Sequence, residues 1–175
     1  MQFDDYKIEL LKPNESEAFF KLIDANRRRL EDFFAGTVSK TETLLETILY
    51  CKEIEERIIE KSYFPFIIIN TVTNKFVGLV DVKNIDWHIP KAELGYFIDA
   101  AYEGNGIITR ATGLVIDYLM ETYRFRKLLA RVGSKNIGSI HVALKNGFEL
   151  EGTIRKDYRT TKGEVVDLNY YGRIF

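Results

Sequence analysis

An apolar β-hairpin near the middle of the chain limits the possible folds more than any other feature. A β-rich run over residues 64–69 is followed by the turn Thr73-Asn74-Lys75 and by a second strand pattern over residues 76–82. Two strands joined by so short a turn pair in antiparallel fashion. A doubly wound fold built only from repeated β-α-β units is therefore excluded.

Strand and helix patterns follow one another on both sides of this hairpin, without a linker, a repeat or a low-complexity segment. We expect strands at 6–11, 91–99, 127–132, 148–155 and 165–171, and helices from 14 to about 29, from 39 through 58, after 106 and from about 136 to 146. This order predicts one α/β (α+β) domain over residues 1–175, with a mixed, mostly antiparallel central sheet flanked by helices.

The two helices before the hairpin carry N-terminal signals. Asn14 with Glu17 and Ser39 with Glu42 have the spacing of a capping box. The consecutive arginines 27–29 point in three directions around a helix, which favours a solvated face over a phosphate site. Aromatic residues in the segment that follows, 30–36, indicate either a lid on the core or the wall of a substrate groove.

Composition excludes several classes of function. With 25 basic and 26 acidic residues, the chain has no general attraction for nucleic acid or for an anionic membrane. Cys51 is the single cysteine, and His88 and His141 lie far apart, so we expect neither a disulfide nor a metal site. Cys51 falls within the apolar stripe of the second helix, which indicates a buried thiol. No signal peptide or long apolar stretch is evident, so a cytoplasmic location is expected.

The segment Gly104-Asn105-Gly106 lies between a strand and a helix. The backbone amides of Gly104 through Thr109, including those of Ile107 and Ile108, could hold a phosphate or pyrophosphate at the helix N-terminus. An ordinary tight turn is the alternative. The sequence has no Gly-Lys-Ser/Thr motif, and a threonine replaces the third glycine of a dinucleotide-binding loop, so both of those phosphate sites are excluded. In the preceding strand, Gly95 indicates a bulge or a close backbone approach.

Three motifs in this order carry a family resemblance: Ala92-Glu93-Leu94-Gly95-Tyr96-Phe97-Ile98-Asp99, Gly104-Asn105-Gly106-Ile107-Ile108-Thr109, and Asn136-Ile137-Gly138-Ser139 followed by Gly147-Phe148. Together they resemble the GNAT superfamily of acetyl-CoA-dependent N-acetyltransferases. More narrowly they are similar to its Rim-type branch, which acetylates the N-terminal alanine or serine of ribosomal proteins. The resemblance implies an acyltransferase with acetyl-CoA as co-substrate and no metal.

The resemblance also implies how acetyl-CoA binds. The strand at 94–99 would carry a bulge that splays it from its neighbour, and the pantetheine arm would fill the gap. Phe97 and Ile98 fall at that bulge, and their backbone groups would pair with the pantetheine amides. Asn136 matches a position that hydrogen-bonds this arm. Lys145 is a candidate for the adenosine phosphate, with a plain surface charge as the alternative.

Two departures from the family pattern bear on binding and catalysis. Ala101 replaces a frequent pyrophosphate contact, and Ala143 replaces the widespread tyrosine general acid. The resemblance implies that Ser139 protonates the departing thiolate; a capping or merely small residue is the alternative. Glu93 is the expected general base, and Asp86 is the alternative candidate.

The sequence constrains the identity of the acetyl acceptor less than any other aspect of the expected function. The Rim-type resemblance implies the α-amine of a protein N-terminus, entering between residues 30–36 and 160–165. A polyamine or an antibiotic is the alternative acceptor, although a polyamine site should be strongly acidic. A catalytically silent acetyl-CoA-binding sensor is an alternative from another functional class. Proteins of this kind often pair, so a homodimer is also considered.

Overall fold

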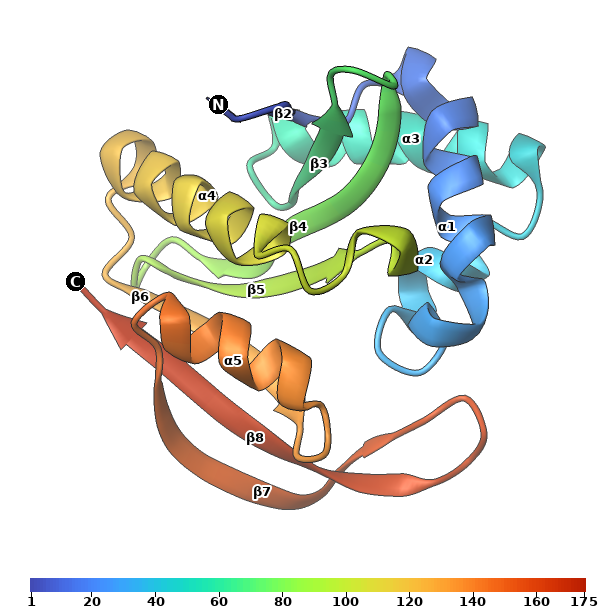
Figure 1. Ribbon diagram of the computed structural model, residues 1–175. Coiled ribbons are helices and arrows are strands. Elements are labelled where there is room, and N and C mark those ends of the chain that lie inside the picture. Colours follow the sequence, from blue (N-terminus) through green and yellow to red (C-terminus); the bar gives the residue numbers. More distant parts are fainter.

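The computed structural model describes all 175 residues and contains one eight-stranded sheet with helices on both faces (Figure 1). The strands are β1 Gln2–Phe3, β2 Tyr6–Leu10, β3 Phe64–Asn70, β4 Lys75–Asp86, β5 Lys91–Ile98, β6 Lys127–Gly133, β7 Glu149–Arg159 and β8 Val165–Ile174. The helices are η1 Pro13–Glu15, α1 Ser16–Leu30, α2 Ala35–Ser39, α3 Leu44–Ile59, η2 Ala100–Tyr102, α4 Ile107–Tyr123 and α5 Ile137–Lys145.

The strands lie in the order β1-β2-β3-β4-β5-β6-β8-β7, and every neighbouring pair except β5–β6 is antiparallel. The mixed, mostly antiparallel α/β fold predicted from the sequence is confirmed. The predicted hairpin is β3–β4, in which Phe64 pairs with Val82 and Asn70 with Lys75.

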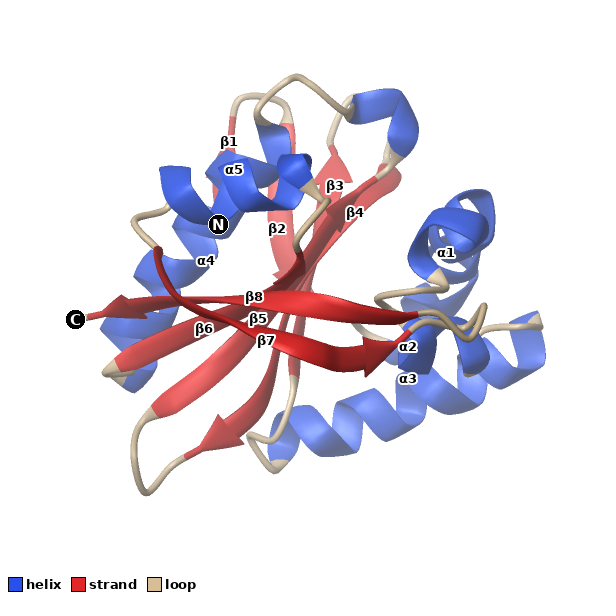
Figure 2. Ribbon diagram, turned by 90° about the horizontal axis from the view of Figure 1, so that it is seen from below, coloured by secondary structure: helices blue, strands red, loops and turns tan.

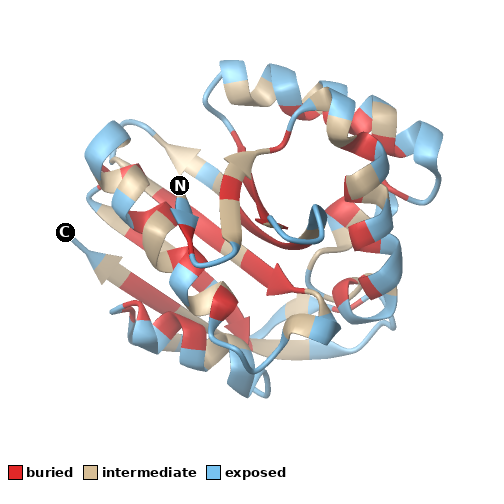
Figure 3. Cartoon of the chain, turned by 45° about the horizontal axis from the view of Figure 1, so that its top comes forward, coloured by how far each residue is buried: buried red, intermediate tan, exposed pale blue.

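The hairpin lies at the centre of the packing because both of its faces are covered. Ile68 belongs to the core beneath α4 and α5, whereas its neighbour Ile67 belongs to the core beneath α1 and α3. Side chains alternate between the two faces of a strand, so an apolar run of this kind needs helices on both sides. Figure 3 shows the buried residues concentrated on the strands and on the helix faces turned towards them. No helix combines the length and the apolar character needed to cross a bilayer.

Both predicted capping boxes are wrong. Pro13 begins a short 3-10 turn that contains Asn14, and α1 starts after it without a side-chain cap. Ser39 ends the unpredicted helix α2, where its hydroxyl donates to the carbonyl of Gly36. The cap of α3 is Thr43, whose hydroxyl accepts from the Glu46 amide at 3.2 Å. The correct signal therefore has the same spacing and lies four residues later in the chain.

The sheet opens between β5 and β6. These parallel strands pair only between Lys91–Glu93 and Lys127–Leu129, after which they separate, as the fan of strands in Figure 2 shows. This confirms the predicted splayed pair. The predicted bulge at Phe97 and Ile98 is wrong, because the β4–β5 register is continuous from Gly78–Ile98 to Lys83–Glu93 and shifts only beyond Lys83. The gap arises because β6 diverges towards β8.

Candidate active site

A cavity of about 140 Å³ lies where β5 and β6 separate. It is bounded by the end of α1 and the segment after it, by β5 and β6, by the first turn of α5, and by Tyr158 on β7. Glu93, Ser139 and Asn136, which the sequence singled out, all line this cleft although they come from β5 and α5. The fold therefore brings the expected catalytic residues together.

The open edge of β5 presents backbone groups to the gap. The Asp99 amide donates to the Val77 carbonyl at 2.7 Å, which sets the alternation of bonds between β4 and β5. The backbone groups of successive residues in a strand point alternately to its two sides. Since Asp99 bonds to β4, the backbone groups of Phe97 also point towards β4, and those of Tyr96 and Ile98 point towards the gap. Of the two residues expected to meet pantetheine, Ile98 is placed for it and Phe97 is not.

The glycine loop ends in a left-handed turn at the start of α4. Gly104 and Gly106 have φ angles of 78° and 72°, values that only glycine adopts easily. The Arg110 amide donates to the Gly106 carbonyl at 3.0 Å and makes the first bond of the helix. The amides of residues 107–109 therefore have no partner within α4, as the sequence predicts for an anion site. Nothing lies within 4 Å of a Cβ built on either glycine, so the space beside the loop is open at both positions.

Glu93 is buried, with 8% of its surface exposed, and one of its oxygens is already engaged. Its Oε2 accepts from Asn84 Nδ2 at 2.8 Å and from Arg131 Nε at 3.0 Å. Its Oε1 has no protein donor. These two bonds fix the carboxylate in the cleft and leave one oxygen to accept a proton.

Ser139 lies in the first turn of α5, where two contacts fix its backbone. Its amide donates to Asn136 Oδ1 at 3.1 Å, so Asn136 caps the helix. Its carbonyl accepts from the Tyr96 hydroxyl at 2.7 Å, across the gap between β5 and α5. Burial raises the pKa of Tyr96, which keeps this hydroxyl protonated and able to donate. The Ser139 hydroxyl and Asn136 Nδ2 make no hydrogen bond within the protein.

Several other candidates from the sequence lie outside the cleft. Asp86 Oδ1 accepts from the amides of Ile89 and His88, and these bonds, that of Ile89 first, lower the pKa of its carboxyl. Cys51 is buried in the core beneath α1 and α3, as predicted, and burial and then Glu15 raise the pKa of its thiol to about 11. Such a thiol is unsuited to nucleophilic attack. Lys145 is exposed at the end of α5 and has no ion-pair partner.

The aromatic segment after α1 forms a wall of the cleft and also covers the core, because Leu30 belongs to the core beneath α1 and α3 and Phe34 packs against it. Phe33 stacks on Tyr158 with ring centroids 5.6 Å apart. Across the entrance, Thr161 Oγ1 donates to Asp32 at 2.9 Å, and Lys162 pairs with Glu31 at 3.4 Å. The segments that were expected to flank the acceptor, 30–36 and 160–165, are therefore in contact.

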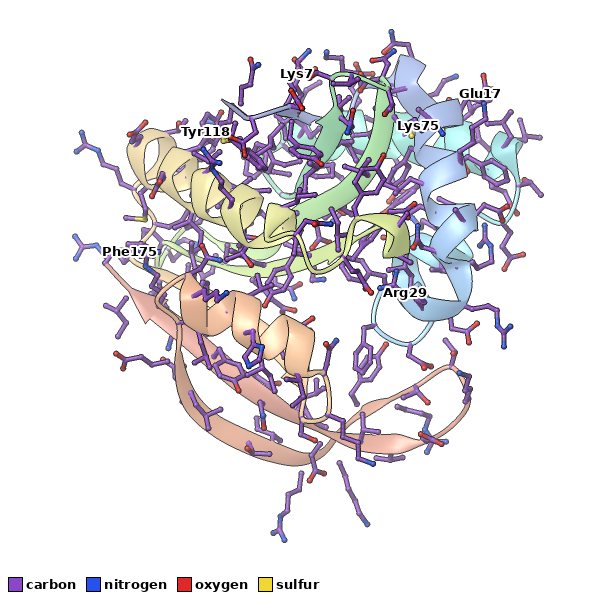
Figure 4. All side chains as sticks on the ribbon, in the orientation of Figure 1. Lys7, Glu17, Arg29, Lys75, Tyr118 and Phe175 are labelled. Carbon is purple, nitrogen blue, oxygen red and sulfur yellow. The ribbon has the colours of Figure 1, made fainter.

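Arg29 is a cleft residue that sequence reasoning missed. The arginine run was predicted to be a solvated face, but Arg29 pairs with Glu103 and donates to the Ile98 carbonyl at 3.4 Å. Figure 4 shows it at the C-terminal end of α1. Arg27 donates to the carbonyls of Val38 and Thr41 and so holds the α2 segment in place. No periodicity in the sequence signals contacts between segments so far apart.

Residues 7–149 match the family model described as the acetyltransferase (GNAT) domain. The probable N-acetyltransferase YjcK of Bacillus subtilis is 33% identical over 150 residues, which are 85% of this chain and 83% of the relative. The ribosomal-protein-serine acetyltransferase of Escherichia coli is 31% identical over 58% of this chain and 56% of its own length. The solved structure of RimL, a ribosomal L7/L12 α-N-protein acetyltransferase in complex with coenzyme A, superposes with a TM-score of 0.90 at 19% identity and covers 99% of this chain and 96% of that chain.

Proposed function

The chain belongs to the GNAT family of acetyltransferases, and from this premise we propose that it transfers the acetyl group of acetyl-CoA to the α-amine of a protein N-terminus. The observation that carries the proposal is the cleft between β5 and β6, which adjoins open backbone groups, a buried carboxylate and a free serine hydroxyl. Acetyl-CoA supplies the thioester when bound. The chain must then hold it, deprotonate an amine and stabilise the developing oxyanion.

The open groups around the cleft fit the parts of acetyl-CoA. The backbone groups of Tyr96 and the amide of Ile98 suit the amides of an extended arm, as an added strand would, whereas the Ile98 carbonyl already accepts from Arg29. The free amides at the start of α4 suit a pyrophosphate. Asn136 Nδ2 is available to the arm, because only Oδ1 of this side chain serves the helix cap. We also propose Lys145 for the adenosine phosphate, since the adjacent Asn146 donates to the Thr109 carbonyl at 3.1 Å and so links the end of α5 to the start of α4.

Two side chains suit the proton transfers. Oε1 of Glu93 is placed to take a proton from the amine, directly or through one water. Ser139 is placed to protonate the thiolate, because its hydroxyl lies in the cleft without a competing protein partner. Ala143, which replaces the common tyrosine acid, is buried and offers no donor.

The charges around the cleft favour a protein N-terminus over a polyamine. A polyamine needs several free carboxylates, but Glu93 is the only acidic residue among those that line the cavity, and it pairs with Arg131. At the entrance, Glu31 and Asp32 pair with Lys162. The spermidine N(1)-acetyltransferase of Escherichia coli is a relative, 33% identical over 81 residues, or 46% of this chain and 44% of its own length. The cavity lining nevertheless offers one carboxylate, already paired with an arginine, where a polyamine would require several.

The proposal is tested by mass-spectrometric detection of acetyl transfer to a panel of amines. We expect transfer to short peptides beginning with serine or alanine, and at least about tenfold lower kcat/KM for spermidine, since its extra ammonium groups would be unpaired in the cleft. The same peptides with blocked α-amines serve as the control. Preferential acetylation of spermidine would overturn the acceptor assignment, and binding of acetyl-CoA without any transfer would favour the silent sensor.

Replacing Glu93 with glutamine is expected to lower kcat for peptide acetylation about 100-fold near neutral pH. The deficit should shrink as the pH rises past the α-amine pKa of about 8, because the amine then reaches the cleft already neutral. Measuring kcat from pH 6 to 10, with calorimetry to check that acetyl-CoA affinity is kept, gives the comparison. A loss of less than about threefold near neutral pH would remove Glu93 as the base.

A further inference from the structure

An amine of the chain itself already lies in this cleft. Lys83 on β4 is the only lysine among the residues that line the cavity. Its Nζ lies 2.9 Å from the position that a Cβ on Gly95 would occupy, and Gly95 directly precedes Tyr96, whose backbone lies on the open edge of β5. The ammonium group is therefore next to the backbone proposed to bind the acetyl-bearing arm.

The surroundings of Lys83 hold this amine in place. Its Nζ lies 3.5 Å from Asp81 Oδ2 and 5.2 Å from the centre of the Phe34 ring, over which it sits. The pair is only partly shielded from solvent, with 28% of the Lys83 side chain exposed against 4% for Asp81. A carboxylate on one side and an aromatic face on the other are the partners that an ammonium group favours.

The Asp81 carboxylate has one oxygen without a hydrogen-bond donor. Its Oδ2 accepts from the Tyr63 hydroxyl at 3.2 Å, but its buried Oδ1 has no hydrogen-bond donor. Orphaned buried carboxylate oxygens are uncommon in folded proteins and call for an explanation. The other oxygen of this carboxylate, Oδ2, lies 3.5 Å from the Lys83 nitrogen, so the carboxylate is placed to take up the proton that the amine must lose before it reacts.

We propose that Lys83 is an acetylation site within its own cleft, modified by acetyl-CoA in the same molecule. This inference rests on the proposed function. The Lys83 ammonium passes one proton to Asp81, and the free amine forms a bond to the thioester carbonyl carbon. The carbon–sulfur bond then breaks, the second proton passes from nitrogen to the thiolate, and Asp81 releases its proton to water. The products are Nζ-acetyl-lysine and coenzyme A, and no oxidant or metal is needed.

The test is incubation of the intact protein with acetyl-CoA alone, followed by peptide mass mapping over time. We expect Lys83 to gain an acetyl group at least about tenfold faster than Lys75, because its amine is held at the reacting group. Lys75 is the matched control: it starts the same strand, has no ion-pair partner and lies at the far end of β4, away from Arg29 (Figure 4). The rate constant should not change with protein concentration, since both reactants belong to one complex.

Two variants sharpen the result. Lys83→Arg keeps the cation but should abolish the fast reaction, and Gly106→Glu, which obstructs the proposed pyrophosphate site, should abolish it at Lys83 while leaving the slow reaction at Lys75. Equal rates at Lys83 and Lys75, or a rate that rises with protein concentration, would overturn the inference. An unmodified Lys83 in protein that acetylates an added peptide would overturn it and leave the proposed function intact. Absence of acetyl-CoA binding would overturn both.

Discussion

Replacing Gly106 with glutamate is expected to weaken acetyl-CoA binding at least about 100-fold, which corresponds to about 2.7 kcal/mol. The free amides of residues 107–109 form the positive end of α4, and the space around the Cβ position of Gly106, which begins this turn, is open. A glutamate at this position would place its own carboxylate near these amides, where the helix dipole attracts it. It would then repel the pyrophosphate and occupy its site.

A loss of binding in this variant could also come from backbone strain. Gly106 has a φ angle of 72°, so any side chain there strains the backbone by about 1–2 kcal/mol. Gly163→Glu is the matched control. Gly163 has a φ angle of 84° and open space around its Cβ position, but it lies in the β7–β8 turn. It therefore reproduces the strain and the added charge at a site remote from α4.

Calorimetric titration of the two variants and the wild type with acetyl-CoA makes the comparison, with thermal unfolding to confirm that each is folded. We expect tight binding by the wild type and by Gly163→Glu only. Equal loss in both variants would assign the effect to strain or charge rather than to the site. Undiminished binding by Gly106→Glu would show that the start of α4 does not hold the pyrophosphate.

Features encoded by neighbouring residues were predictable from the sequence. The β3–β4 hairpin and the glycine loop each depend on a few consecutive residues with strong conformational preferences. Where two similar local signals compete, sequence alone does not choose between them. Ser39-Glu42 and Thr43-Glu46 have the same spacing, and α3 begins at the second of them.

The acceptor side of the cleft was largely unpredictable because its contacts join distant parts of the chain. Thr161 bonds to Asp32 across 129 residues, and Arg29 reaches Ile98 across 69. Neither contact leaves a periodic pattern. The Phe97 assignment failed for a different reason: the motif identifies the strand, but which backbone groups face the gap depends on the register with β4.

Gly95→Ala is expected to destabilise the fold by about 2–3 kcal/mol, a large effect for the addition of one methyl group. A Cβ at this position would lie 2.2 Å from Asp81 Oδ1 and 2.9 Å from Lys83 Nζ. The strand glycine, which the sequence assigned to a bulge or a close approach, reflects a close approach by the Asp81 carboxylate. Because Asp81 is buried and bonded to Tyr63, it has little room to retreat. Urea unfolding measures the change.

A double-mutant cycle with Asp81→Ala tests this cause directly. Once the carboxylate is removed, Gly95→Ala should cost less than about 1 kcal/mol, so the two substitutions should be strongly non-additive. Gly152→Ala on β7 is the control, because nothing lies within 4 Å of its Cβ position, and it should change stability by less than about 0.5 kcal/mol. Additive costs would contradict the steric explanation. Non-additivity would instead show that a glycine is kept at the floor of the cleft because the carboxylate beside Lys83 occupies the space of its side chain.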